Sequence, residues 1–347
     1  MTMKILMCSV PFRPSVGGIE TVSALLAEQF QRLGHTVTLV TQTPSAVADS
    51  ERYAILRRPS AWQLLQAVRA NDVVLHNNIS LRLAWPLLFV RRPWVVAHHT
   101  WLPRSGSGAW AGLLKRAALA WAQNVAVSDA VAADLARPAH VIPNPYDRDL
   151  FQCLPGALRP HELVCVGRLV SDKGVAVLLQ ALSLLRQRGK APRLSIIGSG
   201  PEEAGLRQQV QALGLQAQVH FAGSLVGQSL VRALNAHRVV VVPSVWEEPF
   251  GLVALEAQAC GCLPVVAASG GLPQAAGPAG VVFAKGDPAA LADTLAAVLD
   301  SVPVDGVAQD TRVQRHLQQH HPASVAASYL QVLEHAHRAP GPLARTA

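Results

Sequence analysis

Two glutamates, Glu248 and Glu256, stand in the segment Glu-Pro-Phe-Gly-Leu-Val-Ala-Leu-Glu, with seven residues between them. The segment leads from an apolar strand into an apolar helix, so both carboxylates are expected at one helix entrance. Carboxylate oxygens accept directional hydrogen bonds, and sugar hydroxyls need such acceptors. The pattern therefore indicates a sugar-binding site. The alternative is that Glu248 caps the helix while Glu256 lies on its solvated face.

Two cations, Arg168 and Lys173, flank a glycine-containing turn between a predicted strand and an apolar helix. Cations beside the exposed amides of a helix start can hold a diphosphate without metal and stabilise its charge as it leaves. A turn with a surface arginine and lysine is the alternative reading. The next strand ends at Gly198 and Gly200, where the backbone could approach a nucleoside closely. An ordinary tight turn is again the alternative.

These turns can form one site only if the fold brings them to the same edge of a sheet. The pattern of the rest of the chain predicts such a fold. Apolar strands alternate with helical patterns in two runs, broken by Pro- and Gly-containing chain near residues 143–156. Near-continuous Val, Ile and Leu strands between helices indicate parallel sheets that are covered on both faces. We expect strands near 4–9, 36–41, 72–76, 94–98, 124–127, 139–142, 162–167, 193–198, 218–222, 238–242 and 263–267.

The predicted fold class is therefore α/β, with two doubly wound Rossmann-like domains facing a central cleft at the carboxyl ends of their strands. Residues 1–150 would form an acceptor-binding domain and residues 151–322 a nucleotide-sugar-binding domain. Residues 323–347 would form a helix that packs back on the first domain, followed by a frayed tail.

The charge of the chain is uneven. Residues 1–150 carry 15 Lys and Arg against 9 Asp and Glu, which is +6, while residues 151–347 carry 15 against 13, which is +2. A basic first half suits an anionic partner, and a solvated basic face is the alternative. Charge alone does not support nucleic-acid binding, because no aromatic and basic platform accompanies it.

The sequence predicts a cytoplasmic location, and a location at the inner face of the cell membrane is the alternative that it leaves open. The five cysteines have neither C-x-x-C nor metal-ligand spacing, so they are expected to be free thiols in a reducing compartment. The N-terminus has the pattern of a first strand, and no stretch reaches the length of a spanning helix. Residues 109–121 place Trp110 and Trp121 near Lys115 and Arg116, with Arg91, Arg92 and Arg104 close by in sequence. This helix could lie on an anionic membrane or pack in the core.

Taken together, the motifs resemble glycosyltransferase family 4, whose members are retaining nucleotide-sugar transferases with the GT-B fold. The resemblance covers nearly the whole chain, and the segment from Glu248 to Glu256 is its most specific part. It is carried by Gly17-Gly18-Ile19-Glu20, Ser128-Asp129-Ala130-Val131, Pro143-Asn144, Gly167-Arg168-Leu169 with Lys173-Gly174, Gly198-Ser199-Gly200-Pro201, and Glu248 to Glu256 between Pro243-Ser244 and Gly261.

The resemblance implies roles for the second half of the site. Arg168 and Lys173 would bind the donor diphosphate, Glu256 the ribose and Glu248 the transferred sugar. Main-chain amides of Phe250, Gly251 and Leu252 would add donors at the helix start. Neither a cofactor nor a metal is implied.

In the first half, the resemblance implies that Gly17 and Gly18 let the chain pass close to the donor phosphate and the acceptor. His99 matches a histidine that the family commonly has at the cleft, with His98 as the neighbouring alternative. A hydrogen-bonded histidine inside the fold is the structural reading. Two departures are present: neutral Gln274 follows Gly270-Gly271 where the family often has an acid, and Pro145 stands in the usual place of a glycine.

The predicted activity is therefore retaining, metal-independent transfer from a UDP- or GDP-sugar to a glycan or lipid-linked acceptor, in the assembly of a cell-surface glycan, lipopolysaccharide or polysaccharide. A nucleotide-sugar epimerase or a phosphorylase on the same fold is one alternative. A non-catalytic nucleotide-sugar-binding protein is another. A Rossmann dehydrogenase is disfavoured, because Gly17-Gly18 lacks the Gly-x-Gly-x-x-Gly spacing.

Overall fold

The computed structural model describes residues 2–15, 17–46, 48–103, 109–303 and 307–338. Arg104 and the tail 339–347 lie outside the described residues. The chain divides into two compact units: unit 1 comprises Met1–Pro145 and His320–Ala347, and unit 2 comprises Tyr146–Gln319. The chain thus leaves unit 1 after Pro145, before the boundary expected at residue 150, and returns to it after Gln319.

Unit 1 is built on a sheet of seven parallel strands in the order β3-β2-β1-β4-β5-β6-β7. The central strands β4 and β5 are buried along their whole length, as apolar runs covered on both faces should be. The strands are β1 Lys4–Ser9, β2 Thr36–Thr41, β3 Ala54–Arg57, β4 Val73–Asn77, β5 Trp94–His98, β6 Gln123–Ala126 and β7 Ala139–Val141.

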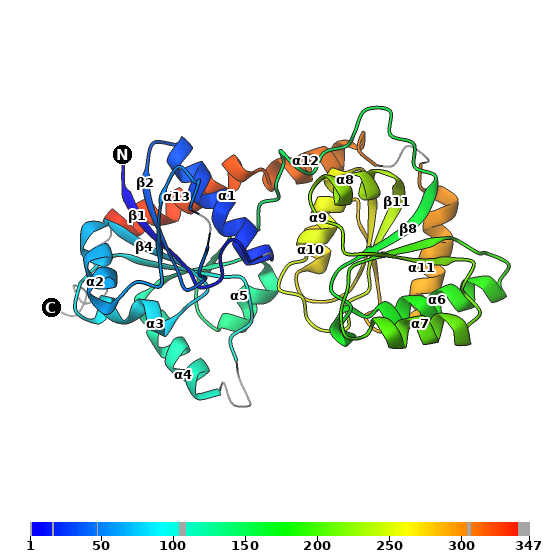
Figure 1. Ribbon diagram of the computed structural model, residues 1–347, viewed down its shortest axis with the longest axis horizontal. Helices are drawn as coiled ribbons and strands as arrows, with labels where there is room; N and C mark the ends of the chain where they lie inside the picture. The colour runs from blue at the N-terminus through cyan, green and yellow to red at the C-terminus, as the bar shows by residue number, and fades with distance from the viewer. Residues whose placement is uncertain (1, 16, 47, 104–108, 304–306, 339–347) are drawn as a thin grey trace. The chain divides into compact units, whose positions relative to one another are not determined.

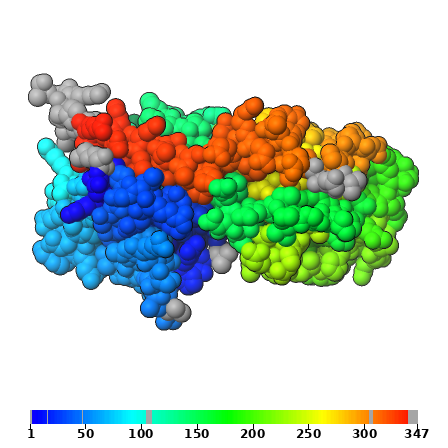
Figure 2. Space-filling view, turned by 90° about the horizontal axis from the view of Figure 1, so that it is seen from above, coloured from blue at the N-terminus to red at the C-terminus, as the bar shows by residue number. Residues whose placement is uncertain are grey.

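The helices of unit 1 cover both faces of this sheet. In Figure 1, α1 and α13 lie above the sheet and α3 and α4 below it, and right-handed crossovers place α2 to α5 on the face opposite α1. The elements are α1 Gly18–Arg32, α2 Ala61–Ala70, α3 Leu81–Ala84, η1 Trp85–Leu88, α4 Ala109–Ala118, η3 Leu119–Trp121, α5 Asp129–Leu135 and α13 Pro322–Arg338. Helix α13 packs on α1, β4 and β5, and Figure 2 shows this red segment lying against the blue N-terminal chain.

Unit 2 has six parallel strands in the order β10-β9-β8-β11-β12-β13, a doubly wound arrangement with its switch point between β8 and β11. Its strands are β8 His161–Val166, β9 Leu194–Ile197, β10 Val219–Gly223, β11 His237–Val242, β12 Leu263–Ala267 and β13 Val281–Phe283. Its helices are η4 Ser171–Lys173, α6 Val175–Gln187, α7 Glu203–Ala212, α8 Gln228–Asn235, α9 Leu252–Ala259, α10 Leu272–Ala276, α11 Pro288–Ser301 and α12 Thr311–Gln319.

The predicted pair of doubly wound α/β domains is confirmed. Each of the eleven expected strands is present, with ends that differ from the expected ones by one residue at most. Two further strands, β3 and β13, were not predicted from the sequence, because each is short and lies at one edge of its sheet. All five cysteines are free, and only Cys153 among them is exposed.

Candidate functional site

Four loops follow the carboxyl ends of β8, β9, β11 and β12, and hydrogen bonds join them. The amide of Val245 donates to the carbonyl of Asp172 at 2.9 Å, and the amide of Gly271 donates to the carbonyl of Glu248 at 2.7 Å. The loops therefore form one continuous edge of unit 2, the end of a doubly wound sheet where ligands bind. We name this edge the unit 2 rim: residues 167–174, 198–202, 243–251 and 269–272.

Glu248 and Lys173 meet on the rim. The ammonium of Lys173 lies 2.5 Å from Oε1 of Glu248, which also accepts a hydrogen bond from the hydroxyl of Ser244 at 2.8 Å. Glu248 is only 7% exposed. A carboxylate this buried needs a charged partner, and Lys173 supplies it. The two residues that the sequence assigns to sugar and phosphate are thus neighbours, each neutralising the other.

The glycines of the rim allow neighbouring loops to pack closely against each other. A Cβ on Gly198 would overlap the carbonyl of Gly167, and one on Gly200 would overlap the carbonyl of Leu169. The amide of Leu169 donates to the carbonyl of Ser199 at 2.9 Å, which holds the two turns together. The close backbone approach expected at these glycines therefore occurs within the protein itself. Contact of Gly198 and Gly200 with a donor stays a prediction.

Arg168 stands on the same loop as Lys173 but is placed differently. Arg168 is exposed, and its guanidinium has no hydrogen-bond or ion-pair partner within the described part of the chain. The structure therefore brings Lys173, but not Arg168, into contact with Glu248. An exposed guanidinium at a sheet edge can still bind a phosphate bidentately.

Glu256 lies in α9, eight residues beyond Glu248, and is partly exposed. Burial of its carboxyl group raises the pKa to about 7, and repulsion from Asp147 adds a smaller contribution. The structure shows no hydrogen bond between Glu256 and the Lys173–Glu248 pair. The two glutamates therefore have different surroundings: Glu248 contacts a lysine, whereas burial brings the pKa of Glu256 close to neutral pH.

Helix α9 begins beside these carboxylates. Gly251 adopts φ +112°, and a Cβ there would overlap the side chain of Leu272. Phe250 is 3% exposed and anchors the turn in the core, while Leu252 is the first helical residue. No side chain caps α9 among the described residues. At the start of α9, therefore, no side-chain cap competes with a polar or anionic ligand.

His99 follows β5 in unit 1 and is held from two sides. Its amide donates to Oδ1 of Asn78 at 2.8 Å, and its Nδ1 lies 3.1 Å from Oδ1 of Asn144. Its Nε2 is buried with no partner among the described residues. Burial lowers the pKa of His99 to about 4, so the ring is neutral at pH 7. With the proton on Nδ1 bonded to Asn144, Nε2 is a hydrogen-bond acceptor that needs a donor.

His98 is the alternative that the sequence left open. It is buried too, and its Nε2 lies 3.1 Å from Oδ1 of Asn124. The structural reading, a hydrogen-bonded histidine inside the fold, thus suits His98 better than His99. The main-chain carbonyl of Asn144 in turn accepts a hydrogen bond from Nδ1 of His320 at 2.8 Å. The two points where the chain crosses between the units are therefore tied together next to His99.

Gly17 and Gly18 lie where β1 runs into α1. Gly17 is extended, and Gly18 is the first residue of the helix. Glu20, in the first turn, folds back so that a Cβ on Gly17 would overlap its carboxylate. A flexible side chain, and not backbone, occupies this space. Contact of the two glycines with a ligand stays a prediction.

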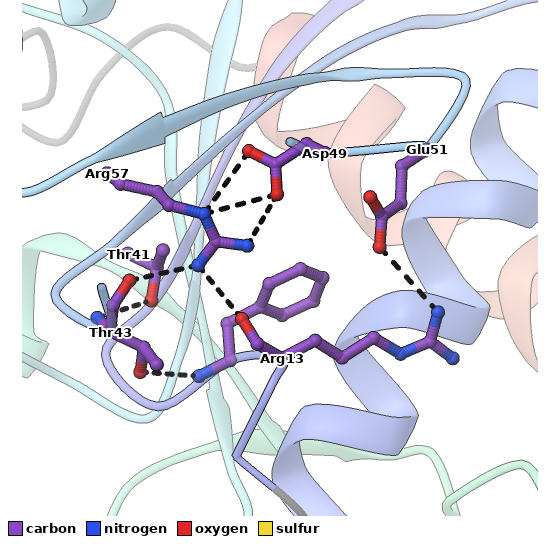
Figure 3. Close-up of polar contacts among 7 residues, drawn as sticks. Arg13, Thr41, Thr43, Asp49, Glu51 and Arg57 are labelled. Carbon is purple, nitrogen blue, oxygen red and sulfur yellow. Dashed lines mark hydrogen bonds and ion pairs between the residues drawn. The ribbon is translucent and has the colours of Figure 1, made fainter. Parts of the chain in front are cut away.

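The loop that precedes these glycines is fixed by Arg57 at the end of β3 (Figure 3). Its guanidinium donates to the carbonyls of Arg13 at 2.8 Å and Thr43 at 2.9 Å. It also pairs with both carboxylate oxygens of Asp49, at distances of 2.6 to 3.2 Å. Arg13 extends across to Glu51, at 3.8 Å. We name residues 10–15 the glycine-loop approach; Arg57 joins it to the loop after β2.

Three partners of the site were not assigned from sequence: Ser244, Asn144 as the partner of His99, and Arg57. Ser244 stands two residues after the end of β11 and Asn144 three residues after the end of β7, and a polar residue just beyond a strand is the signal that could have found them. Arg57 had no such signal, because its role depends on β3, a strand too short to be recognised.

Comparison with known proteins agrees with this geometry. Residues 154–305 match the family model of glycosyl transferases group 1, and residues 16–150 match the model of Glycosyltransferase Family 4. Two doubly wound α/β units that carry these matches define a protein of the GT-B class. The chain belongs to glycosyltransferase family 4.

Relatives support the same family. A glycogen synthase of Mycobacterium tuberculosis is 39% identical over 143 residues, which are 41% of this chain and 34% of the relative. A D-inositol 3-phosphate glycosyltransferase of Corynebacterium diphtheriae is 37% identical over 160 residues, or 44% of this chain and 37% of the relative. The chain spans only about a third of the length of these curated relatives.

Solved structures match over far more of the chain. HepE of Anabaena, in complex with UDP and glucose, superposes with a TM-score of 0.76 and covers 96% of this chain and 100% of its own. The sequences are 20% identical, so this likeness shows the fold.

Proposed function

We propose that the protein transfers a sugar from a nucleotide-diphosphate sugar to an acceptor hydroxyl with retention of configuration. The observation that carries the proposal is the contact between Lys173 and Glu248 on the unit 2 rim. A donor needs a cation for its diphosphate and an acceptor group for its sugar hydroxyls, side by side. Lys173 and Glu248 offer both within one partly buried ion pair, at the edge of the sheet where ligands bind.

In this proposal the donor separates the pair. The diphosphate takes Lys173 and the exposed Arg168, and Glu248 then accepts hydrogen bonds from the transferred sugar. Lys173 and Arg168 stabilise the negative charge that grows on the departing nucleotide, which is the role a metal ion would otherwise fill. Glu256 binds the ribose, and the start of α9, with Phe250, Gly251 and Leu252, adds amide donors. A UDP-sugar or GDP-sugar is the proposed donor, and the HepE complex with UDP supports the former.

Unit 1 would supply the acceptor side. Gly17 and Gly18 leave room for the acceptor, and the unpaired Nε2 of His99 would accept a hydrogen bond from a sugar hydroxyl. We assign no carboxylate nucleophile. A glycan or lipid-linked acceptor, at the inner face of the cell membrane, is the proposed partner.

Replacing the two paired residues tests the proposal. The Lys173→Ala and Glu248→Ala variants should each lose at least about a hundredfold in transfer rate, since each removes a group that the donor needs in the transition state. Transfer is measured with radiolabelled UDP- and GDP-sugars and a membrane extract as the acceptor source. Full activity in both variants would count against the site.

The matched control is an ion pair of the same type outside the rim. Lys190 lies 2.5 Å from Asp300, but both side chains are well exposed. Lys190→Ala and Asp300→Ala should keep full activity, because exposed pairs contribute little. Incubation with donor alone identifies an epimerase, which converts the donor without acceptor. A phosphorylase would instead cleave a glycosidic bond of a glycan with inorganic phosphate and release a sugar phosphate, without any nucleotide sugar. A non-catalytic protein would bind the donor but change nothing.

A further inference from the structure

Helix α4 presents its apolar side to solvent. Trp110 is 74% exposed, and Leu113, Leu114 and Trp121 are each more than half exposed. With 3.6 residues per turn, positions 110, 113, 114, 117 and 121 fall on one side of the helical chain. The apolar stripe that the sequence could have placed in the core therefore lies outside it.

The opposite side of the same helix attaches it to unit 1. A Cβ on Gly112 would overlap the carbonyl of Pro103, so the helix backbone rests directly on that segment. Arg116 lies 3.3 Å from a carboxylate oxygen of Asp134 and donates to the carbonyl of Leu102. Arg116, one of the two basic residues of this helix, therefore holds the helix to the fold.

Other apolar side chains are exposed on the same face of the sheet. Among the described residues, ten large apolar side chains are more than half exposed, and seven of them belong to α2, the end of η1, α4 and η3. The right-handed crossovers put these elements together on the face opposite α1. The seven are Trp62, Leu88, Phe89, Trp110, Leu113, Leu114 and Trp121. We name them the aromatic face; it includes Trp62, Phe89, Trp110 and Trp121, the four most exposed aromatic side chains.

The chain from β4 to the end of β6 carries only basic charges, and Asp134 of α5, on the same face of the sheet, is paired with Arg116. Residues 73–128 contain no Asp or Glu, whereas they contain six Lys and Arg. Of these, Arg82 and Arg91 are exposed and stand next to the apolar side chains of η1. A protein partner of ordinary composition gives no reason for a run of 56 residues without Asp or Glu. An anionic lipid surface gives one, because every acidic side chain on the face would oppose binding to it.

We propose that the aromatic face of unit 1 binds the surface of an anionic lipid bilayer. Trp110, Leu113 and Leu114 enter the boundary between headgroups and acyl chains, and Arg82 and Arg91 contact lipid phosphates. Among the described residues, no helix is long and apolar enough to cross a membrane, so the contact lies in the plane of the surface. The inference rests on the membrane location of the proposed function, which it makes specific, and not on the transfer chemistry.

Vesicle sedimentation tests it. The full chain is mixed with vesicles of phosphatidylcholine alone or with about a third of phosphatidylglycerol, and the pelleted fraction is measured. We expect binding to the anionic vesicles that falls as salt is raised, since the arginine contacts are screened. The Trp110→Ser, Leu113→Ser, Leu114→Ser triple variant should lose at least about tenfold in partition coefficient, and Arg82→Ser with Arg91→Ser should lose the salt dependence.

Matched controls come from unit 2. Leu158 and Val226 are 85% and 67% exposed, and Arg232 and Arg315 are exposed cations. Changing the first two to Ser, or the last two to Ser, should leave vesicle binding unchanged. Circular dichroism and thermal unfolding show that each variant is folded. Binding of UDP by calorimetry separates this inference from the proposed function, because a failed donor site would leave vesicle binding intact.

Three outcomes would overturn the proposal. One is a wild-type chain that stays in the supernatant with both kinds of vesicle at low salt. Another is a wild-type chain that sediments as a dimer without lipid while the triple variant is monomeric, which would make the aromatic face an interface with a second copy. Equal loss of binding in the unit 2 controls would also exclude a specific face.

Discussion

The two glutamates that open the site differ because their surroundings differ. Glu248 contacts the ammonium of Lys173 at 2.5 Å, whereas burial raises the pKa of Glu256 to about 7. A protonated carboxyl group can donate one hydrogen bond, but only the ionised form accepts from both hydroxyls of a ribose. Glu256 should therefore change its capacity to bind a nucleoside within the physiological pH range.

Donor binding should consequently strengthen as pH rises through 7. At about pH 6 Glu256 is mostly protonated and at about pH 8 mostly ionised, so the Kd for UDP should fall between them, by about tenfold at most. Calorimetry of the wild type and of Glu256→Gln measures it. The Glu256→Gln variant keeps the shape of the side chain but has no titrating group at this position. Any change of its Kd with pH therefore comes from the titration of UDP itself. Parallel pH profiles for the two proteins would show that Glu256 does not bind the ribose.

The elements of unit 1 contribute through one connection that sequence does not reveal. Arg57, at the end of β3, bonds to the carbonyls of Arg13 and Thr43 and to Asp49 (Figure 3). Its side chain is 16% exposed. Within the glycine-loop approach, the amide of Phe12 donates to the hydroxyl of Thr43 at 3.1 Å. The order of the glycine loop therefore depends on a strand that lies at the far edge of the sheet.

Arg57→Ala should loosen this loop more than it destabilises the protein. Loss of the carbonyl bonds leaves the amides of Phe12 and Ser15 to exchange faster, and the cost in folding free energy should be about 1 to 2 kcal/mol. Hydrogen exchange and chemical denaturation measure the two effects. Under the proposed function, KM for the acceptor rises more than kcat falls, because the loop positions substrate but contributes no reacting group.

Two further variants test the geometry. Arg57→Lys keeps the charge but cannot bond to Asp49 and two carbonyls at once, so it should behave like Arg57→Ala. Arg32→Ala removes the exposed pair with Glu28 on α1, at 2.6 Å, and should change neither exchange nor KM. Unchanged exchange at Phe12 and Ser15 in Arg57→Ala would refute the role.

The limits of sequence reading follow from the same elements. Long apolar strands and glycine turns were predictable because periodicity and backbone geometry act locally. The location of Lys173 and Glu248 at one edge of the sheet followed from the rule that parallel strands end at the same edge, whereas the ion pair between them was not predicted. By contrast, the Arg57 connection depends on a four-residue strand, and the outward stripe of α4 depends on Gly112 resting on Pro103. An apolar stripe has the same period whether it faces the core or solvent, so sequence could not decide.

The two units also differ in the pKa shifts of their buried titratable groups. Burial lowers the pKa of His76 to about 3 and of His98 and His99 to about 4, all in unit 1. In unit 2, burial lowers the pKa of His237 to about 4, but it raises that of Glu256 to about 7. The lowered histidines also include His35 in unit 1 and His316 in unit 2.

These shifts have opposite signs for stability. A histidine with a folded pKa below 6.5 binds its proton more readily in the unfolded chain, so the folded state loses stability as pH falls from 6.5 towards 4. Glu256 does the reverse: its folded pKa exceeds the ordinary 4.5, so it stabilises the fold below pH 4.5 and loses that contribution as pH rises through 7. In unit 2 the two effects oppose each other, whereas in unit 1 the histidines act alone.

Unit 1 should therefore be the acid-sensitive half of the molecule. We expect scanning calorimetry to resolve two transitions and to identify that of unit 2 as the one that UDP raises. Between about pH 7.5 and pH 5, the other transition should fall by several degrees more than the UDP-sensitive one, since ordinary carboxylates hardly titrate in that range. His76→Gln, which removes the most strongly shifted histidine, should reduce the shift of unit 1 and leave unit 2 unchanged. If the UDP-sensitive transition moved as far as the other, or further, the buried histidines would not control acid stability.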